Sequence, residues 1–128
     1  MGLRDRLTRR LVPEGGISVD EALALLGRGG VLVDVRTPAE YEAGHAPGAR
    51  LVDVRQLAAD PFTAVFSDDP LVEPDAPVVL ICDTGLRSGH AVRLLTEKSM
   101  SGSFVAGGLR AWLAAGQVLI PGPPRHPR

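Results

Sequence analysis

Two short runs of apolar, largely β-branched residues constrain the fold of this chain more than any other feature. One covers residues 31–35 (VLVDV) and the other covers residues 77–81 (PVVLI). Both are typical of strands covered on two faces, as in a parallel sheet. Helix signals flank the first run, because Ser18 and Glu21 form a capping-box pattern before it and Thr37 is placed as an N-cap after it. Strands that alternate with helices predict an α/β fold, with a central, mostly parallel sheet and helices on both faces.

The remaining patterns complete this alternation. We expect further strands near residues 49–54 and 103–105, and helices near residues 18–26, 38–43, 55–59, 87–98 and 109–115. Residues 60–76 are rich in proline and aspartate and carry Phe62, Phe66 and Leu71; they predict a long excursion held on the domain by its aromatic residues. The proline-rich segment after Ile120 is predicted to be disordered.

The length fits one domain with two extensions. A chain of 128 residues has the size of one typical domain. We expect a basic N-terminal extension over residues 1–15, the domain itself over residues 16–118, and a proline-rich tail over residues 119–128. The extension holds four arginines, and its leucines are spaced like one face of a helix. We interpret it as packing loosely on the domain rather than as binding a membrane.

Composition excludes several classes of function. A net charge of −1 argues against a general nucleic-acid binder, which needs a basic excess. The single cysteine allows no internal disulfide, and no cysteine and histidine residues have the spacing of a zinc site, so we expect no metal. No apolar run has the length of a membrane span. We therefore expect a cytoplasmic location, where a lone thiol stays reduced.

The single cysteine, Cys82, directly follows the second apolar run, and a helix is expected to begin near Arg87. Ligands of open parallel sheets bind at the carboxyl ends of the strands. The loop amides, the start of the helix and the positive charge of Arg87 all favour an anion there, so the pKa of the thiol should lie below its reference value. Gly85 can supply the positive φ that such a tight turn often needs. These residues predict a thiolate nucleophile or an anion carrier, and they do not decide between the two.

Three segments of the chain resemble, in order and in spacing, the signatures of the rhodanese family of sulfurtransferases. Asp34-Val35-Arg36, then Glu40-Tyr41 and residues 44–49 (GHAPGA), are similar to the first signature. Residues 82–87 (CDTGLR) are similar to the six-residue active-site loop of the family. Gly107-Gly108, Ala111-Trp112 and Gly116 are similar to its closing signature. Together these segments cover about residues 17–117.

The resemblance implies that Cys82 accepts a sulfane sulfur as a persulfide and passes it to a nucleophilic acceptor, with no metal or organic cofactor. It implies a small sulfur donor or a protein persulfide as partner, and a protein as a possible acceptor. The catalytic residues are then Cys82 and Arg87. The loop amides would hold the outer sulfur, with a hydroxyl from Thr84 as a further donor. The residues of the persulfide-binding loop are Asp83, Thr84, Gly85, Leu86 and Ser88, and the residues of structural support are Asp34, Arg36, Glu40 and His45.

Asp83 departs from the family pattern, which commonly has a basic residue directly after the cysteine. We expect its carboxylate to face the mouth of the pocket and to repel anionic donors such as thiosulfate. Persulfide chemistry itself does not depend on that charge.

Two other functions compete with sulfur transfer. A phosphatase or arsenate reductase also places a cysteine and an arginine around an oxyanion, but its loop is longer than the four residues that separate Cys82 from Arg87 here. A sulfur-carrier or sensor module that docks another protein is the second alternative. The presence of Cys82 argues against an inactive scaffold.

Overall fold

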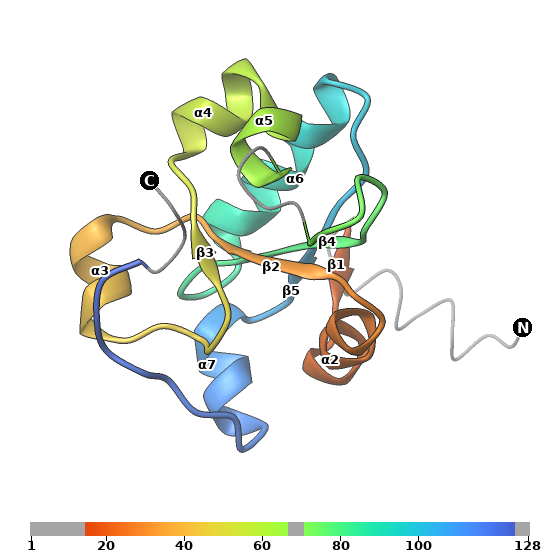
Figure 1. Cartoon of the computed structure of the whole chain (residues 1–128). Helices are drawn as coiled ribbons and strands as arrows, with labels where there is room; N and C mark the ends of the chain where they lie inside the picture. The colour runs from red at the N-terminus through yellow and green to blue at the C-terminus, as the bar shows by residue number, and fades with distance from the viewer. Residues whose placement is uncertain (1–14, 67–70, 125–128) are drawn as a thin grey trace, which may run out of the picture.

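The computed structural model describes residues 15–66 and 71–124, which form a five-stranded parallel sheet with helices on both faces (Figure 1). The strand order is β1-β5-β4-β2-β3, and all neighbouring strands of this sheet pair in parallel. In chain order the elements are β1 (Gly16–Ile17), α2 (Val19–Gly27), β2 (Val31–Asp34), α3 (Pro38–Ala43), β3 (Arg50–Leu51), α4 (Val54–Ala59), α5 (Pro61–Phe66), β4 (Val78–Ile81), α6 (Leu86–Glu97), β5 (Ser103–Val105) and α7 (Gly108–Ala114). The predicted fold class is confirmed.

The two apolar runs form the adjacent central strands, and their side chains alternate between two cores. In β4, Val78 and Leu80 pack on the side of α4, α5 and α6, whereas Val79 and Ile81 pack on the side of α2, α3 and α7. This alternation follows from the period of two residues in a strand, and both faces are apolar because both are covered by helices. Cys82 continues the alternation and lies in the first of these cores.

The structure corrects the prediction for residues 60–76, because α5 begins within them. Asp60 caps this helix: one carboxylate oxygen accepts a hydrogen bond from the amide of Thr63 at 3.2 Å, and the other accepts one from the Thr63 hydroxyl at 2.7 Å. An aspartate followed by proline is an ordinary helix start that the composition of the segment obscured. Phe66 is buried as expected, and Phe62 packs on it although its own side chain is 51% exposed.

Smaller differences concern the edge strands and the C-terminal segment. β1 was not predicted, and β3 is shorter than the expected strand over residues 49–54. The prediction of disorder after Ile120 is wrong for the residues directly after it, because the amide of Gly122 donates a hydrogen bond to the carbonyl oxygen of Glu42 at 3.0 Å. Proline-rich composition did not reveal that a few backbone hydrogen bonds hold this segment on the domain. The division into a domain and two extensions remains a prediction, and residues 1–14 lie outside the described part of the chain.

None of the helices in the described ranges is long and apolar enough to cross a membrane.

Candidate functional site: the Cys82 loop

The loop that begins at Cys82 is fixed by close backbone contacts between the end of β4 and the starts of α6 and α7. The Cys82 carbonyl oxygen accepts a hydrogen bond from the amide of Leu109 at 2.8 Å. Gly85 has the expected positive φ, +102°, and a Cβ atom at this position would lie only 3.2 Å from the Gly107 nitrogen. A Cβ atom on Gly108 would lie 2.4 Å from the Cys82 carbonyl oxygen, so this approach requires glycine. The loop is therefore held in one shape by its neighbours.

Three hydrogen-bond donors converge on the sulfur atom of Cys82, which belongs to a residue only 1% exposed. The amide nitrogen of Gly85 lies 3.1 Å from Sγ, and the amide nitrogen and the hydroxyl oxygen of Ser88 each lie 3.3 Å from it. Burial acts most strongly on the thiol and raises its pKa, but the hydrogen bonds from Ser88, Gly85 and the Thr84 amide together outweigh burial and hold the pKa of Cys82 below its ordinary value. This direction agrees with the prediction from the sequence.

The hydroxyl donor of the site is Ser88, not Thr84 as expected. Thr84 is exposed, and it acts on the sulfur through its backbone amide. Ser88 is fully buried and lies on the same face of α6 as Ala91, Val92 and Leu95. Ser88 follows the reactive loop directly and is in register with the apolar face of the helix. This position is the sequence signal that could have identified Ser88 as the hydroxyl donor. Gly85 and Ser88 donate to Sγ itself, and the binding of an outer sulfur by the loop amides stays a prediction.

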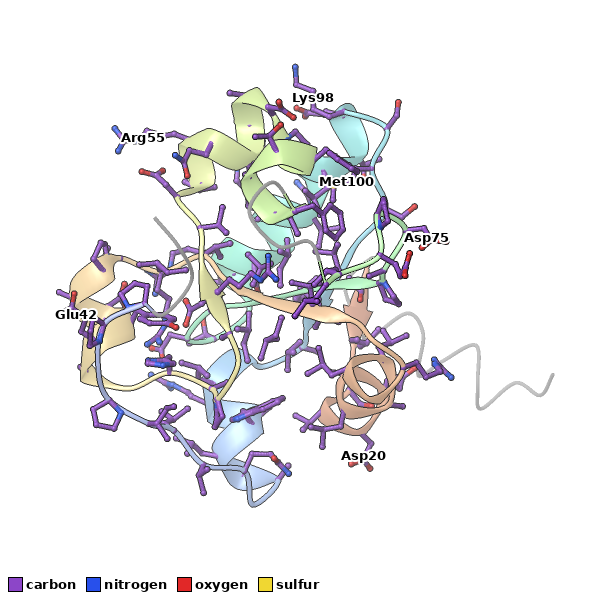
Figure 2. The ribbon with its side chains drawn as sticks, in the orientation of Figure 1. Asp20, Glu42, Arg55, Asp75, Lys98 and Met100 are labelled. Carbon is purple, nitrogen blue, oxygen red and sulfur yellow. The ribbon has the colours of Figure 1, made fainter. Side chains whose placement is uncertain are left out.

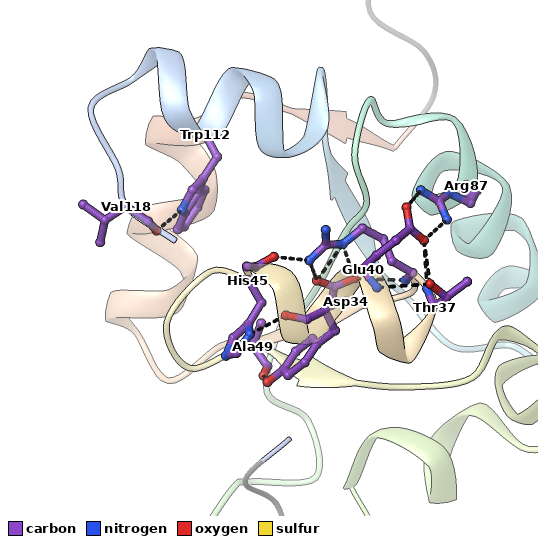
Figure 3. Close-up of polar contacts among 11 residues, drawn as sticks. Asp34, Thr37, Glu40, His45, Ala49, Arg87, Trp112 and Val118 are labelled. Atoms are coloured by element: carbon purple, nitrogen blue, oxygen red, sulfur yellow. Dashed lines mark hydrogen bonds and ion pairs between the residues drawn. The ribbon is translucent and has the colours of Figure 1, made fainter. Parts of the chain in front are cut away.

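Arg87 is held by an acid from a different element (Figure 3). Its Nη1 and Nη2 atoms donate to the two carboxylate oxygens of Glu40 in α3, at 2.7 and 2.9 Å. This bidentate bond, with the Thr37 amide that also donates to Glu40, lowers the pKa of Glu40 to about 2. The same pairing raises the pKa of Arg87, and the charges of Cys82 and Asp83 act in the same direction. Arg87 therefore links the loop of residues 82–87, the sulfur loop, to α3, and its positive charge still acts on the sulfur atom of Cys82.

The expected charged support beneath the site divides into two separate pairs. Arg36 binds the fully buried Asp34 through Nε and Nη2, with a shortest distance of 2.8 Å, and Nη2 also donates to the carbonyl oxygen of Gly44 at 2.7 Å. Glu40 does not join this pair; it binds Arg87 and caps α3 through Thr37. All three residues form charged hydrogen bonds, but Glu40 does not join Asp34 and Arg36 in one network.

His45 lies in the turn after α3, where its ring stacks on Tyr41 with 3.7 Å between the ring centroids. Its Nδ1 atom lies 2.8 Å from the carbonyl oxygen of Tyr41 and donates to it (Figure 3). This geometry matches the interpretation of His45 as a hydrogen-bonded turn residue.

The other two loop residues differ in exposure. Leu86 is 82% exposed at the start of α6. Asp83 is partly buried, and its carbonyl oxygen accepts a hydrogen bond from the amide of Arg110 at 3.3 Å. Its charge acts on Arg87, but no ion pair joins the Asp83 carboxylate to an arginine in residues 15–66 or 71–124. The same two ranges hold no cluster of three metal-binding side chains.

A model of the rhodanese-like domain matches residues 18–115 of the chain. The chain belongs to the rhodanese-like family. The thiosulfate sulfurtransferase GlpE of Pseudoalteromonas translucida (strain TAC 125) is 31% identical over 101 residues, which are 77% of this chain and 89% of that protein. The structure of the human single-domain sulfurtransferase TSTD1 is also similar, with 29% identity and a TM-score of 0.63 over 78% of this chain and 96% of that one. A protein of unknown function from Rhodopseudomonas palustris CGA009, described as a possible tyrosine phosphatase, is similar at 26% identity and a TM-score of 0.63 over 94% and 95% of the two chains.

Proposed function

We propose that this rhodanese-like protein is a sulfurtransferase that carries sulfane sulfur as a persulfide on Cys82. The observation that carries the proposal is the convergence of three donors, from Gly85 and Ser88, on a buried sulfur in the family's active-site loop. These donors favour the thiolate, which is the nucleophilic form of cysteine. The thiosulfate sulfurtransferase among the relatives supports the same chemistry.

The reaction needs two displacements at sulfur and no change of net redox state. In the first, the Cys82 thiolate attacks the sulfane sulfur of the donor; a bond from Sγ to that sulfur forms, and the donor leaves with the electron pair of the broken bond. In the second, a nucleophilic acceptor attacks the outer sulfur, and the bond to Sγ breaks with its electron pair returning to Sγ. Because Ser88 and Gly85 donate to Sγ, they stabilise the thiolate that leaves in the second step.

The charge around Arg87 favours a persulfide over thiosulfate as the sulfur donor. Arg87 already binds Glu40 and has the charge of Asp83 nearby, so little of its positive charge is left for a dianion. We propose a small or protein-borne persulfide as the donor in the cytoplasm, with thiosulfate as a weaker alternative. A protein acceptor fits the exposed Leu86 at the edge of the loop.

A phosphatase is the competing function, because one similar structure is described as a possible tyrosine phosphatase. Only four residues separate Cys82 from Arg87, and the donors are already within 3.3 Å of Sγ. This tight loop suits one sulfur atom better than the three equatorial oxygens of a phosphoryl group.

Intact mass spectrometry after incubation with thiosulfate, an organic persulfide or p-nitrophenyl phosphate tests the proposal. We expect the organic persulfide to add one sulfur atom, which cyanide or a thiol then removes. The matched control is Cys82→Ser, which replaces only the sulfur and should gain nothing. A wild-type protein that gains no sulfur from either donor, or that releases p-nitrophenol as fast as it transfers sulfur, contradicts the proposal.

A further inference from the structure

The sulfur loop lies between two helices that cover opposite faces of the sheet. Figure 2, which has the orientation of Figure 1, shows α6 above the sheet and α7 below it. The side chain of Cys82 belongs to the core on the α6 side, whereas Leu109 and Trp112 of α7 belong to the core on the opposite side. Ser88 of α6 contacts Sγ directly, and α7 instead contacts the backbone of the loop.

Two amides of α7 bind two consecutive carbonyl oxygens of the sulfur loop. The amide of Leu109 donates to the carbonyl oxygen of Cys82 at 2.8 Å, and the amide of Arg110 donates to the carbonyl oxygen of Asp83 at 3.3 Å. Both amides lie in the first turn of α7, where the helix itself offers them no acceptor. The orientation of two adjacent peptide groups in the loop is therefore fixed by α7.

This orientation also determines where the N–H groups of the loop point. The peptide bonds of the loop are trans, so the C=O and N–H of each peptide group point in opposite directions. Because the carbonyl oxygens of Cys82 and Asp83 face α7, the amides of Asp83 and Thr84 point away from α7, toward the side on which Sγ lies. The Thr84 amide acts on the sulfur there. Among residues 15–66 and 71–124 the Asp83 amide has no hydrogen-bond acceptor, and it is available to an outer sulfur.

Gly108 sets the distance between α7 and the loop. Its φ is +58°, and a Cβ atom at this position would overlap the carbonyl oxygen of Cys82 and lie 2.6 Å from the carbonyl carbon and oxygen of Asp83. These three nearest atoms all belong to the backbone of the sulfur loop. Any side chain at this position would push the loop away from the two amides, so the glycine serves the loop rather than the packing of α7 itself.

We infer that Gly108 is a positioning residue of the persulfide site. The close approach that it allows lets the two amides of α7 turn the amides of Asp83 and Thr84 toward the outer sulfur of Cys82–S–S⁻. The inference rests on the proposed function, and it assigns a part in sulfur binding to a segment that follows the reactive cysteine by more than twenty residues.

The site then has two sets of donors with different tasks. Gly85 and Ser88 bind Sγ, and Asp83 and Thr84 bind the outer sulfur. Thr84 is the weakest of the donors that lower the pKa of the thiol. A change at Gly108 should therefore weaken the persulfide much more than the thiolate.

A sulfur-exchange equilibrium tests this difference. The Cys82 thiolate takes the outer sulfur from the persulfide of N-acetylcysteine: a bond forms from Sγ to that sulfur, and N-acetylcysteine leaves as its thiolate with the electron pair of the broken bond. Intact mass spectrometry at fixed ratios of persulfide to thiol, above the pKa of Cys82, gives the exchange constant. We expect Gly108→Ala to lower this constant about tenfold, since hydrogen bonds to a charged sulfur are lost. The pH midpoint of alkylation should move far less than in Ser88→Ala.

The matched control is Gly116→Ala, in the turn after α7. Gly116 has a φ of +87°, and a Cβ atom there would have nothing within 4 Å. Its replacement strains the backbone without touching the loop. Both variants should be less stable in urea, but only Gly108→Ala should bind sulfur more weakly. Equal exchange constants in the two variants would overturn the positioning role.

NMR of the wild type decides the question even if Gly108→Ala does not fold. When ¹⁵N-labelled protein is loaded with sulfur, we expect the amide proton resonances of Asp83 and Thr84 to move downfield and their exchange with solvent to slow, because they bind a charged sulfur. The amides of Leu86 and Arg87, at the start of α6, are the alternative donors. If only these two respond to loading, the inference is wrong.

The outcomes separate this inference from the proposed function. If the wild type takes up sulfur but the amides of Asp83 and Thr84 do not respond, sulfur transfer stands and the positioning role of Gly108 fails. If the wild type takes up no sulfur, the proposed function fails and this inference fails with it.

Discussion

Ser88 has the most direct influence of any side chain on the reactive sulfur, because its hydroxyl and its amide both reach Sγ at 3.3 Å. The hydroxyl oxygen also lies 3.4 Å from the carbonyl oxygen of Gly85, which offers the proton a second acceptor. A hydroxyl has one proton to donate. The Ser88 hydroxyl can therefore donate to Sγ when Cys82 is a thiolate, and to the Gly85 carbonyl oxygen when the negative charge lies on the outer sulfur of the persulfide. Ser88 is thus placed to follow the charge during the reaction.

We predict that Ser88→Ala raises the pKa of Cys82, since it removes one of the hydrogen bonds that lower it. The pH dependence of alkylation should shift upward, and discharge of the persulfide should slow about tenfold, because a hydrogen bond to a charged group contributes about 1.5–3 kcal/mol. The rate at which a donor transfers sulfur to Cys82 should change much less at a pH above the thiol pKa, because the thiolate is then already formed.

The matched control for this prediction is Thr84→Ala, which removes an exposed hydroxyl from the same loop while its backbone amide still acts on the sulfur. We expect an unchanged pKa and discharge rate. If Ser88→Ala slows loading and discharge equally at every pH, the hydroxyl has only a packing role.

At the scale of elements, the important contact joins α3 to the sulfur loop through Glu40 and Arg87. Glu40 performs two tasks, since it completes the capping box with Thr37 and binds both terminal nitrogens of Arg87. The capping box was readable in the sequence because it involves residues three positions apart. The ion pair was not readable, because it joins residues that are 47 positions apart and depends on the parallel order of β2 and β4.

The same distinction explains which parts of the fold the sequence predicts. The two central strands and the helices around them follow from local patterns of apolar residues and caps. The edge strands β1 and β3 have only two residues each, and they exist because a neighbouring strand supplies their hydrogen bonds. For the site, the position of Cys82 and the positive φ of Gly85 were predictable. The choice of Ser88 over Thr84 as the hydroxyl donor depended on which side of α6 faces the core.

We predict that Glu40→Gln lowers the free energy of unfolding by about 0.5–1 kcal/mol near neutral pH, as for a partly exposed ion pair. The folded state lowers the pKa of Glu40 from 4.5 to about 2, so the stabilisation is present above about pH 4.5 and is lost as the pH falls toward 2. Urea denaturation at pH 7 and at pH 3 should therefore show a difference between variant and wild type that shrinks at the lower pH.

Glu21→Gln is the control for this effect, because Glu21 occupies the same capping-box position in α2 and its side chain accepts a hydrogen bond from the Ser18 amide of the same box. We expect a smaller loss of stability from it. An equal loss in the two variants would show that Glu40 acts only as a cap.

At the scale of the whole molecule, backbone hydrogen bonds join the C-terminal segment to the turn that follows α3. His45 and Ile120 exchange two backbone hydrogen bonds, with the His45 amide donating at 2.9 Å and the Ile120 amide at 2.8 Å. The same turn supplies the Gly44 carbonyl oxygen that binds Arg36, and Arg36 lines a pocket beside the sulfur loop. Backbone contacts between segments 75 positions apart thus support one wall of this pocket.

The last prediction tests this support with Ile120→Pro, which removes the amide that donates to the buried His45. We expect the free energy of unfolding to fall by about 1–2 kcal/mol, because a carbonyl oxygen loses its partner and proline cannot replace the donor. Ile120→Ala keeps both backbone bonds and trims a side chain that is 39% exposed, so its effect should be clearly smaller. Urea denaturation gives the two values, and hydrogen exchange at the His45 amide should accelerate only in the proline variant. If the alanine variant is destabilised as much as the proline variant, side-chain packing holds the segment and the backbone bonds contribute little.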